Sequence, residues 1–393
     1  MPYRKFQADY LFDGTHFRLE ESVLIVDESG KIVDTVIPSN AGADVETFKG
    51  IISPGFVNAH CHLELSHLKS IIPERTGLID FVFNIVTQRH FAEEDILQAI
   101  TRAENEMMQN GIVAIGDICN NLTTLFQKKK NNLRYYNFVE VSGWLPEIAD
   151  NRINKAKFFY DSFIQAGVPA SIVPHAPYSV SKNLWEKMSE FFSKKTITIH
   201  NQENAEEDLF FLEGKGNFNQ MYELMNIDNS FYHPPKRRSV ENYFNRLAPA
   251  ASVILVHNTF TTQEDIDLIR QQKNKDQLIS FCLCPNANLY IENTLPPVNL
   301  FIDNDCPIIL GTDSLASNHQ LNILEEIKTI ALNFPDIPTE SMLKWATANG
   351  ARALQMENEI GSFEKRKMPG VILIENVESG KIARESKIKV LVA

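Results

Sequence analysis

The chain has 393 residues, of which 44% are hydrophobic, and its net charge is −12. This length accommodates an eight-stranded α/β barrel of roughly 250 residues together with a small further domain. The acidic charge, without a basic stripe, argues against nucleic acid as a partner. We interpret the lysine triplet at residues 128–130 as a solvated helix end.

The amino-terminal residues and the cysteines together favour one cellular compartment. The first ten residues hold no continuous apolar stretch, and no apolar run of about 18 residues occurs in the sequence. The five cysteines form neither an even disulfide framework nor a CxxC pair. We therefore expect a protein of the reducing cytoplasm without a membrane partner.

Both ends of the chain have the pattern of short β-strands. Residues 22–27 and 31–37 predict two strands joined by a turn at Gly30, and residues 371–377 and 387–393 predict strands of the same style. We expect residues 1–52 and 356–393 to form one small β-sandwich domain. Residues 53–355 would then be a catalytic domain.

Helical and strand patterns alternate between these ends. Residues 92–110 predict a helix with Ile96, Ile100 and Ala103 on one face. Gly111 is expected to end this helix, because glycine is common directly after the last helical residue. This alternation predicts a (β/α)8 barrel of the TIM type. Eight short apolar segments are its predicted strands: residues 51–57, 112–118, 135–141, 170–174, 196–200, 252–257, 278–283 and 307–311.

One connection is longer than barrel loops usually are. Residues 214–247 lie between the predicted strands at 196–200 and 252–257, and they include the aromatic and basic stretch 231–238. Two interpretations stay open for this segment. It is either a lid over the substrate or a surface insertion, in which case residues 236–238 face solvent.

Histidines and acids stand where several predicted strands end. His60 and His62 follow the first barrel strand, His200 and His257 end two later strands, and Asp313 follows the last. Active sites of α/β enzymes are found at this edge of the sheet. We therefore expect these side chains to meet at one site.

The spacing of His60 and His62 favours metal binding. Residues two apart on an extended chain project to the same face, so both imidazoles point one way and Cys61 points the other. A histidine pair alone is equally explained by hydrogen-bonded or exposed side chains. With a third histidine and a carboxylate, the set suits zinc or another borderline divalent ion.

The motifs of this chain resemble those of a known superfamily. PGFVNAHCHLELS, VPHAPYS, HNQE, LVHN and GTDSLASN occur in this order between about residues 8 and 375. As an ordered set they resemble the metal-dependent amidohydrolases, in particular the cyclic deaminase and chlorohydrolase branch. That branch includes aminodeoxyfutalosine, adenosine-type and guanine deaminases.

The resemblance implies a metal centre and its catalytic residues. It implies one divalent transition metal, zinc or alternatively iron, because the fourth strand carries His175 and no lysine that would bridge a second metal. Glu203 is implied as the proton carrier and His257 as the residue that orients water or polarises the substrate. The implied metal ligands are His60, His62, His200 and Asp313, with Asp313 also the first proton acceptor.

The resemblance also implies substrate contacts and a reaction. Glu64, His175, Tyr178 and Asn288 are the candidate contacts, with a core role as the alternative for His175. We expect hydrolytic deamination of a small nitrogen heterocycle, with a modified adenine nucleoside such as aminodeoxyfutalosine as the leading candidate. The alternatives are ring amide or halide hydrolysis at the same centre and a non-catalytic barrel scaffold. The resemblance also allows a homodimer, by analogy with related enzymes.

Overall fold

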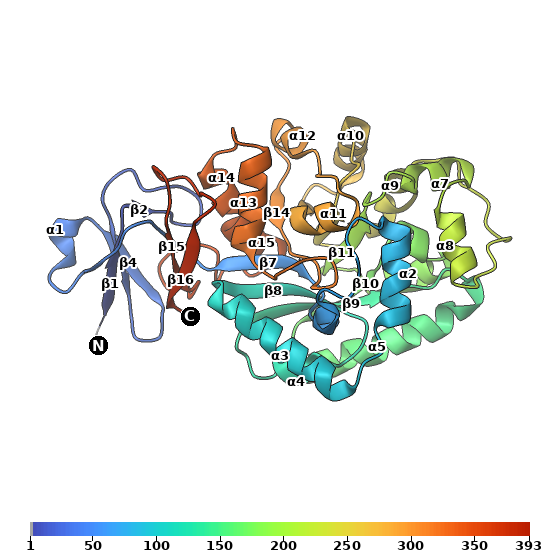
Figure 1. Cartoon of the computed structure of the whole chain (residues 1–393), viewed down its shortest axis with the longest axis horizontal. Coiled ribbons are helices and arrows are strands. Elements are labelled where there is room, and N and C mark those ends of the chain that lie inside the picture. Colours follow the sequence, from blue (N-terminus) through green and yellow to red (C-terminus); the bar gives the residue numbers. More distant parts are fainter. Residues whose placement is uncertain (1–2) are drawn as a thin grey trace.

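Two of the four sheets in the computed structural model, which describes residues 3–393, are built from the ends of the chain (Figure 1). The first sheet has the order β4-β3-β1-β5 and the second the order β16-β15-β6-β2. In the second sheet, Leu373 pairs with Ile52, so the two ends of the chain share one sheet. The strands are β1 (Arg4–Gln7), β2 (Tyr10–Leu11), β3 (Val23–Val26), β4 (Ile32–Val36), β5 (Glu46–Thr47), β6 (Ile51–Ser53), β15 (Val371–Glu375) and β16 (Lys387–Val392). Helix α1 (Pro38–Ala41) lies beside them.

The middle of the chain forms two four-stranded sheets in which every pairing is parallel. Backbone hydrogen bonds also link the two sheets, because His200 donates to the His175 carbonyl at 2.9 Å and Asp313 donates to the His60 carbonyl at 3.1 Å. The fold is therefore mixed α/β with parallel sheets. Its strands are β7 (Phe56–Cys61), β8 (Ile112–Cys119), β9 (Arg134–Val141), β10 (Ala170–Pro174), β11 (Thr196–Asn201), β12 (Ser252–His257), β13 (Leu278–Leu283) and β14 (Ile308–Leu310).

Seven of the eight predicted central strands are confirmed to within one residue at each end. The predicted strand at residues 51–57 is wrong, because two strands occupy this region. β6 pairs in the terminal sheet and β7 begins three residues later. The break falls at Pro54, which has no amide hydrogen for a sheet, and at Gly55, where a Cβ atom would lie 2.8 Å from the Pro369 carbonyl oxygen.

Helices follow the central strands, and the predicted helix at residues 92–110 is confirmed as α3. Ile100, Ala103 and Met107 form its buried face, and three acidic residues in its first turn complement the positive end of the helix dipole. The others are α2 (Leu78–Gln88), α3 (Glu93–Gln109), α4 (Leu125–Lys128), α5 (Ala149–Gln165), α6 (Lys182–Ser189), α7 (Glu207–Glu213), α8 (Phe218–Leu224), α9 (Ser239–Tyr243), α10 (Gln263–Gln272), α11 (Pro285–Ile291), α12 (Val298–Asp303), α13 (Ile323–Asn333), α14 (Thr339–Lys344) and α15 (Gly350–Ala353). Short 3-10 turns are η1 (Leu63–Leu68), η2 (Pro146–Ile148), η3 (Pro177–Ser179) and η4 (Phe244–Leu247), and a π-helical turn is η5 (Trp345–Asn349).

A separate hydrophobic cluster lies on the segments that follow the carboxyl ends of the central strands. We call it the mouth cluster. Trp144 stacks on Tyr222 with ring centroids 5.1 Å apart, and α2 and α8 lie side by side at the right of Figure 1. The members of the cluster are Leu68, Ile72, Leu78, Ile79, Phe81, Trp144, Ala176, Tyr178, Phe210, Phe211, Phe218, Met221, Tyr222, Tyr290, Ile291 and Ala316.

The long connection at residues 214–247 is largely ordered by this cluster. It contains α8, α9 and η4, and α8 buries three of the cluster residues. Trp144 also donates a hydrogen bond from Nε1 to Asn229 at 2.7 Å. Arg238 does not simply face solvent, since its guanidinium lies 2.9 Å from Asp208 and 2.8 Å from Asp265.

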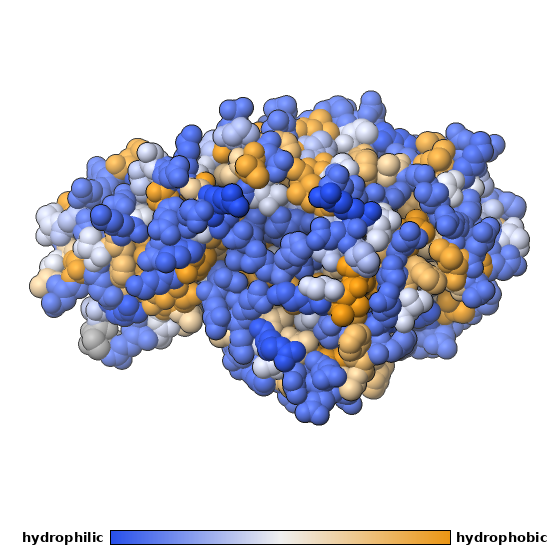
Figure 2. Space-filling model, viewed as in Figure 1, coloured by the Kyte–Doolittle hydropathy of each residue, from blue (hydrophilic) through white to orange (hydrophobic). Residues whose placement is uncertain are grey.

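The surface seen in Figure 2 is mainly hydrophilic, with apolar residues in scattered patches. Among the helices of residues 3–393, none is both long enough and apolar enough to cross a bilayer.

Candidate active site

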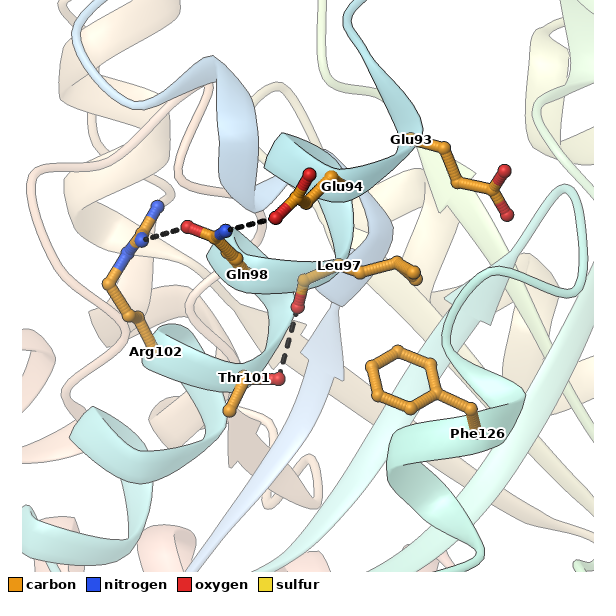
Figure 3. A pocket seen from close by; sticks show the side chains of 7 residues that line it. All are labelled: Glu93, Glu94, Leu97, Gln98, Thr101, Arg102 and Phe126. Atoms are coloured by element: carbon orange, nitrogen blue, oxygen red, sulfur yellow. Dashed lines mark hydrogen bonds between the residues drawn. The ribbon is translucent and has the colours of Figure 1, made fainter.

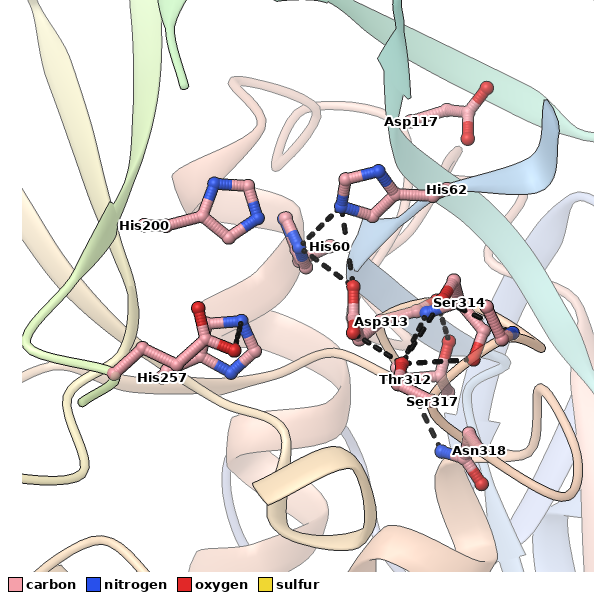
Figure 4. A network of polar contacts seen from close by, with 12 residues as sticks. His60, His62, Asp117, His200, His257, Thr312, Asp313, Ser314, Ser317 and Asn318 are labelled. Atoms are coloured by element: carbon pink, nitrogen blue, oxygen red, sulfur yellow. Dashed lines mark hydrogen bonds and ion pairs between the residues drawn. The ribbon is translucent and has the colours of Figure 1, made fainter. Parts of the chain in front are cut away.

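Four histidines and one aspartate meet at the carboxyl ends of the central strands (Figure 4). One donor atom from each of His60, His200, His257 and Asp313 lies within 4.8 Å of the other three. His62 Nε2 lies 3.2 Å from both His60 Nε2 and Asp313 Oδ1. The five residues that strand-end reasoning selected are therefore neighbours in space.

Burial keeps most of the imidazoles neutral. His62, His200 and His257 are each less than 10% exposed. Because burial disfavours the charged ring, the pKa of His200 falls to about 4 and that of His257 to about 3, and the pKa of His62 also lies well below its usual value. Neutral rings have a free nitrogen lone pair at pH 7, as a metal ligand requires.

The backbone is strained where site residues leave their strands. His257 and Asp313 have φ angles of 72° and 57°, which are in the left-handed region. Such conformations cost about 1–3 kcal/mol each in residues other than glycine and cluster at functional sites. At the neighbouring Gly311, a Cβ atom would lie 2.8 Å from the His60 Cβ, so only glycine lets β14 approach this closely.

Hydrogen bonds from residues outside the cluster orient His200 and Asp313. His200 Nδ1 lies 2.8 Å from the His175 carbonyl oxygen. Since a carbonyl only accepts, Nδ1 carries the proton, which leaves Nε2 free as a ligand. Ser317 donates a short hydrogen bond to Asp313 Oδ2. Sequence reasoning missed Ser317, although it stands in the GTDSLASN motif.

This donor set fits a divalent transition metal. It combines several imidazoles with one carboxylate, and neutral imidazole nitrogen suits zinc, iron or copper better than magnesium or calcium. Two imidazole Nε2 atoms also lie 3.2 Å apart, at His60 and His62, and His60 Nδ1 is buried without a hydrogen-bond partner. A cation between the rings could accept a lone pair from each Nε2 atom.

Glu203 lies directly beside the cluster. Its Oε1 atom is 3.4 Å from His257 Nε2, and only 5% of the residue is exposed. Burial, assisted by the charge of Asp313, raises the pKa of Glu203 well above its usual value. A raised pKa favours the protonated carboxyl group, which can donate a proton to a leaving group.

The candidate substrate contacts differ in how they are engaged. The Tyr178 hydroxyl and Asn288 Oδ1 are buried without partners. His175 packs against His200 with ring centroids 4.8 Å apart, and its Nδ1 lies 2.9 Å from the Ser179 hydroxyl. Tyr178 and Asn288 therefore retain polar atoms that a ligand could satisfy, whereas His175 Nδ1 already has a partner.

Glu64 is instead tied to the protein, and a second acid lies near it. Both carboxylate oxygens of Glu64 accept the Asn120 backbone N–H, at 3.1 and 3.2 Å. The Asn120 side chain also donates to Glu140 Oε2 at 3.0 Å. Glu140 Oε1 is buried, has no hydrogen bond and lies 3.5 Å from His200 Nδ1. Sequence reasoning missed Glu140, although it is the residue before the last in the predicted strand at residues 135–141.

A surface hollow elsewhere shares no residue with this site (Figure 3). It lies between α3 and α4, where Arg102 contacts Gln98 and Gln98 contacts Glu94. We assign the hollow no part in the chemistry, because it lacks histidine and lies on different elements from the cluster.

Comparisons with known proteins agree with this geometry. Residues 51–389 match the Amidohydrolase family. A 5'-deoxyadenosine deaminase of Methanococcoides burtonii is 24% identical, over 90% of this chain and 79% of that protein. The structure of Helicobacter pylori aminofutalosine deaminase in complex with methylthio-coformycin has a TM-score of 0.75 at 22% identity, over 97% of this chain and 93% of that one.

A further similar structure is the atrazine chlorohydrolase of Arthrobacter aurescens complexed with zinc. Its TM-score is 0.73 at 16% identity, and the match covers 99% of this chain and 93% of that one. At such identities the structural likeness concerns the fold, whereas the family match covers most of the sequence. The resemblance read from the motifs is confirmed, and the chain belongs to the amidohydrolase family.

Proposed function

We propose that this protein is a metal-dependent hydrolase that removes the exocyclic amine of an adenine-type nucleoside and releases ammonia. The observation that carries the proposal is the buried cluster of His60, His62, His200, His257 and Asp313 with Glu203 beside it. The deaminase names of the similar proteins support the choice of reaction.

We further infer that the eight central strands close into a TIM-type barrel. Hydrogen bonds from the β11 residue His200 to His175, and from Asp313 to the β7 residue His60, support closure at the two seams. Residues 53–355 would be this catalytic barrel, and residues 1–52 and 356–393 the composite β-sandwich domain. The separate hydrophobic core around Phe6, Leu24 and Leu373 supports that division.

The proposed metal is a single zinc or iron ion held by His60, His62, His200 and Asp313. When bound, such an ion supplies Lewis acidity, which lowers the pKa of water from about 15.7 towards 7. His257 belongs to the same donor group but also lies within 3.4 Å of Glu203 and of Asn288. These polar neighbours support its role in orienting the water or the substrate rather than holding the metal.

The proposed chemistry is addition of water to the amine-bearing ring carbon, followed by cleavage of the carbon–nitrogen bond. Asp313 takes the first proton from the attacking water. Glu203 gives a proton from Oε1 to the amine, which leaves as ammonia when the carbon–nitrogen bond breaks. The second proton of the added water returns to Glu203 as the ring carbonyl forms, and the proton held by Asp313 passes to the adjacent ring nitrogen. His257 stays neutral because of its low pKa and holds the attacking group by a hydrogen bond.

We assign substrate binding to the buried polar atoms without partners around the cluster. The Tyr178 hydroxyl, Asn288 Oδ1 and Glu140 Oε1 are acceptors or donors that burial makes costly to leave unsatisfied. His175 lies against the ring of His200 and would contact the heterocycle. Glu64 is a further candidate contact. A modified adenine nucleoside such as aminodeoxyfutalosine remains our leading substrate.

A substrate screen tests this function. The zinc-loaded protein is incubated with adenine nucleosides, free aminopurines, pterins and chlorotriazines, and ammonia and chloride are both measured. We expect ammonia from at least one adenine nucleoside. Chloride release without ammonia release would indicate a chlorohydrolase instead of a deaminase. If the metal-loaded protein converts none of the compounds, a non-catalytic scaffold is favoured.

A further inference from the structure

Lys128 is enclosed within the protein, so the expectation of a solvated lysine triplet is wrong for this residue. It ends α4 and is 1% exposed. Its Nζ lies 2.5 Å from Asp117 Oδ2, 2.6 Å from Asn137 Oδ1 and 3.1 Å from Cys119 Sγ. Three acceptors therefore surround one buried ammonium group, and its neighbour Lys129 is exposed.

The other oxygen of Asp117 leads from this ammonium group to the metal site. Asp117 Oδ1 accepts the backbone N–H of Leu63 at 2.8 Å. Leu63 is the first residue of η1 and directly follows His62, whose own side chain does not cap that turn. Figure 4 shows Asp117 near His62. Asp117 thus supplies the acceptor that the start of this turn needs.

The two buried charges depend on each other. Burial opposes the charged form of Lys128, but Asp117 and Cys119 outweigh it and raise the pKa of the lysine. A buried carboxylate that loses its cation must take up a proton, find solvent or move. Asp117 therefore depends on Lys128 to stay charged and fixed at the point where it accepts the Leu63 N–H.

We propose that the Lys128–Asp117 ion pair is a positioning element of the metal centre. Lys128 fixes the Asp117 carboxylate, Asp117 fixes the Leu63 N–H, and the fixed backbone sets where the His62 imidazole stands. The inference rests on the proposed metal site. It gives a function to a buried ion pair that touches neither substrate nor metal.

The first test compares Lys128→Met with Lys129→Met, which removes the same charge from an exposed neighbour. Zinc affinity is measured by competition with a chelator, and the ligand geometry by the visible absorption of the cobalt-substituted protein. Mutation of residues that support metal ligands typically lowers metal affinity by roughly 10- to 100-fold. We expect a loss of this size and an altered cobalt spectrum in Lys128→Met, with neither change in Lys129→Met.

Two double variants keep the test decisive if Lys128→Met does not fold. Asp117→Asn with Lys128→Met removes both charges but keeps an oxygen that can accept from Leu63. Asp117→Leu with Lys128→Met removes both charges and the acceptor, and apolar replacement of a buried ion pair is often tolerated. We expect both to fold, judged by circular dichroism, and the leucine variant to bind zinc about 10- to 100-fold more weakly than the asparagine variant.

Equal zinc affinity in the two double variants, or failure of both to fold, would overturn the positioning role. If wild-type protein itself binds no metal, the proposed function fails instead. If the wild-type protein binds metal and the variants have the same zinc affinity and cobalt spectrum, the positioning role is contradicted and the proposed function is not.

Discussion

At the scale of single residues, the buried acids Glu203 and Asp313 favour opposite protonation states. Burial raises the pKa of Glu203. Burial also acts on Asp313, but the hydrogen bond from His60 and the neighbouring imidazoles outweigh it and hold the Asp313 pKa well below its usual value. Carboxyl groups whose environments separate their pKa values in this way can divide acid and base roles.

Glu203→Gln tests the proton carrier. The amide keeps the shape of the side chain but cannot exchange a proton, so we expect activity to fall by about 10²–10⁴ while metal content stays unchanged. Steady-state kinetics and elemental analysis measure the two effects. Glu213→Gln, at an exposed surface pair with Lys215, is the control. Nearly full activity in Glu203→Gln would mean that another residue moves the proton.

His175→Ala tests the division between substrate and metal contacts. The variant keeps the His175 backbone carbonyl that orients His200, so the metal should remain bound. Loss of a buried hydrogen bond of about 1.5–3 kcal/mol should lower kcat/KM roughly 10- to 100-fold. Kinetics on the best nucleoside, together with metal analysis, give the answer. Metal loss would show that the His175 side chain supports the metal centre.

At the scale of elements, the strands were predictable because each is a short apolar run, and the active-site edge was predictable because polar residues follow those runs. Other features depend on contacts between distant segments. Lys128 resembles its exposed neighbours in sequence, and only the fold brings it to Asp117. Glu140 likewise could not be selected from the sequence, because its contacts with Asn120 and His200 form only in the fold. The strand predicted at residues 51–57 ran through Pro54, and only the fold shows that this residue separates strands of two different sheets.

The segment at residues 214–247 should control substrate choice, because α8 completes the mouth cluster. Phe218 packs on Tyr178 with centroids 4.4 Å apart, and the Tyr222 hydroxyl donates to the Tyr178 carbonyl. Exchange of the segment for that of a related deaminase should change the ratio of kcat/KM between two nucleosides, with metal content preserved. Tyr222→Phe should cause a smaller change in the same ratio. If the ratio is unchanged in both the exchanged protein and Tyr222→Phe, the segment is a surface insertion and not a lid.

Glu326 on α13 links stability to pH. It accepts hydrogen bonds from Asn286 at 2.9 Å and Asn318 at 2.8 Å, and burial raises its pKa to about 8. Because this value exceeds the usual 4.5, its stabilising contribution is complete below pH 4.5 and is lost as the pH rises through 8. The Tm of wild type minus that of Glu326→Gln should therefore fall between pH 5 and pH 8. A constant difference across that range would contradict the raised pKa.

At the scale of the whole molecule, the chain combines a central α/β region with sheets from both ends. β15 pairs with β6, and only Pro54 and Gly55 separate β6 from the β7 strand that leads to His60 and His62. The terminal sheet is thus directly connected to the first metal-site strand. The exact domain boundaries and a homodimer remain predictions, whereas the family is established by the match over residues 51–389.

The central claim is that one metal ion and the residues around it make this protein a deaminase. The most direct measurement strips the protein with a chelator, returns zinc in steps, and follows ammonia release from 5'-deoxyadenosine or the best nucleoside of the screen. We predict negligible release from the stripped protein and a linear rise that stops at one zinc ion per chain. A rise that continues to two ions, full activity without metal, or no ammonia at any zinc level would contradict the account.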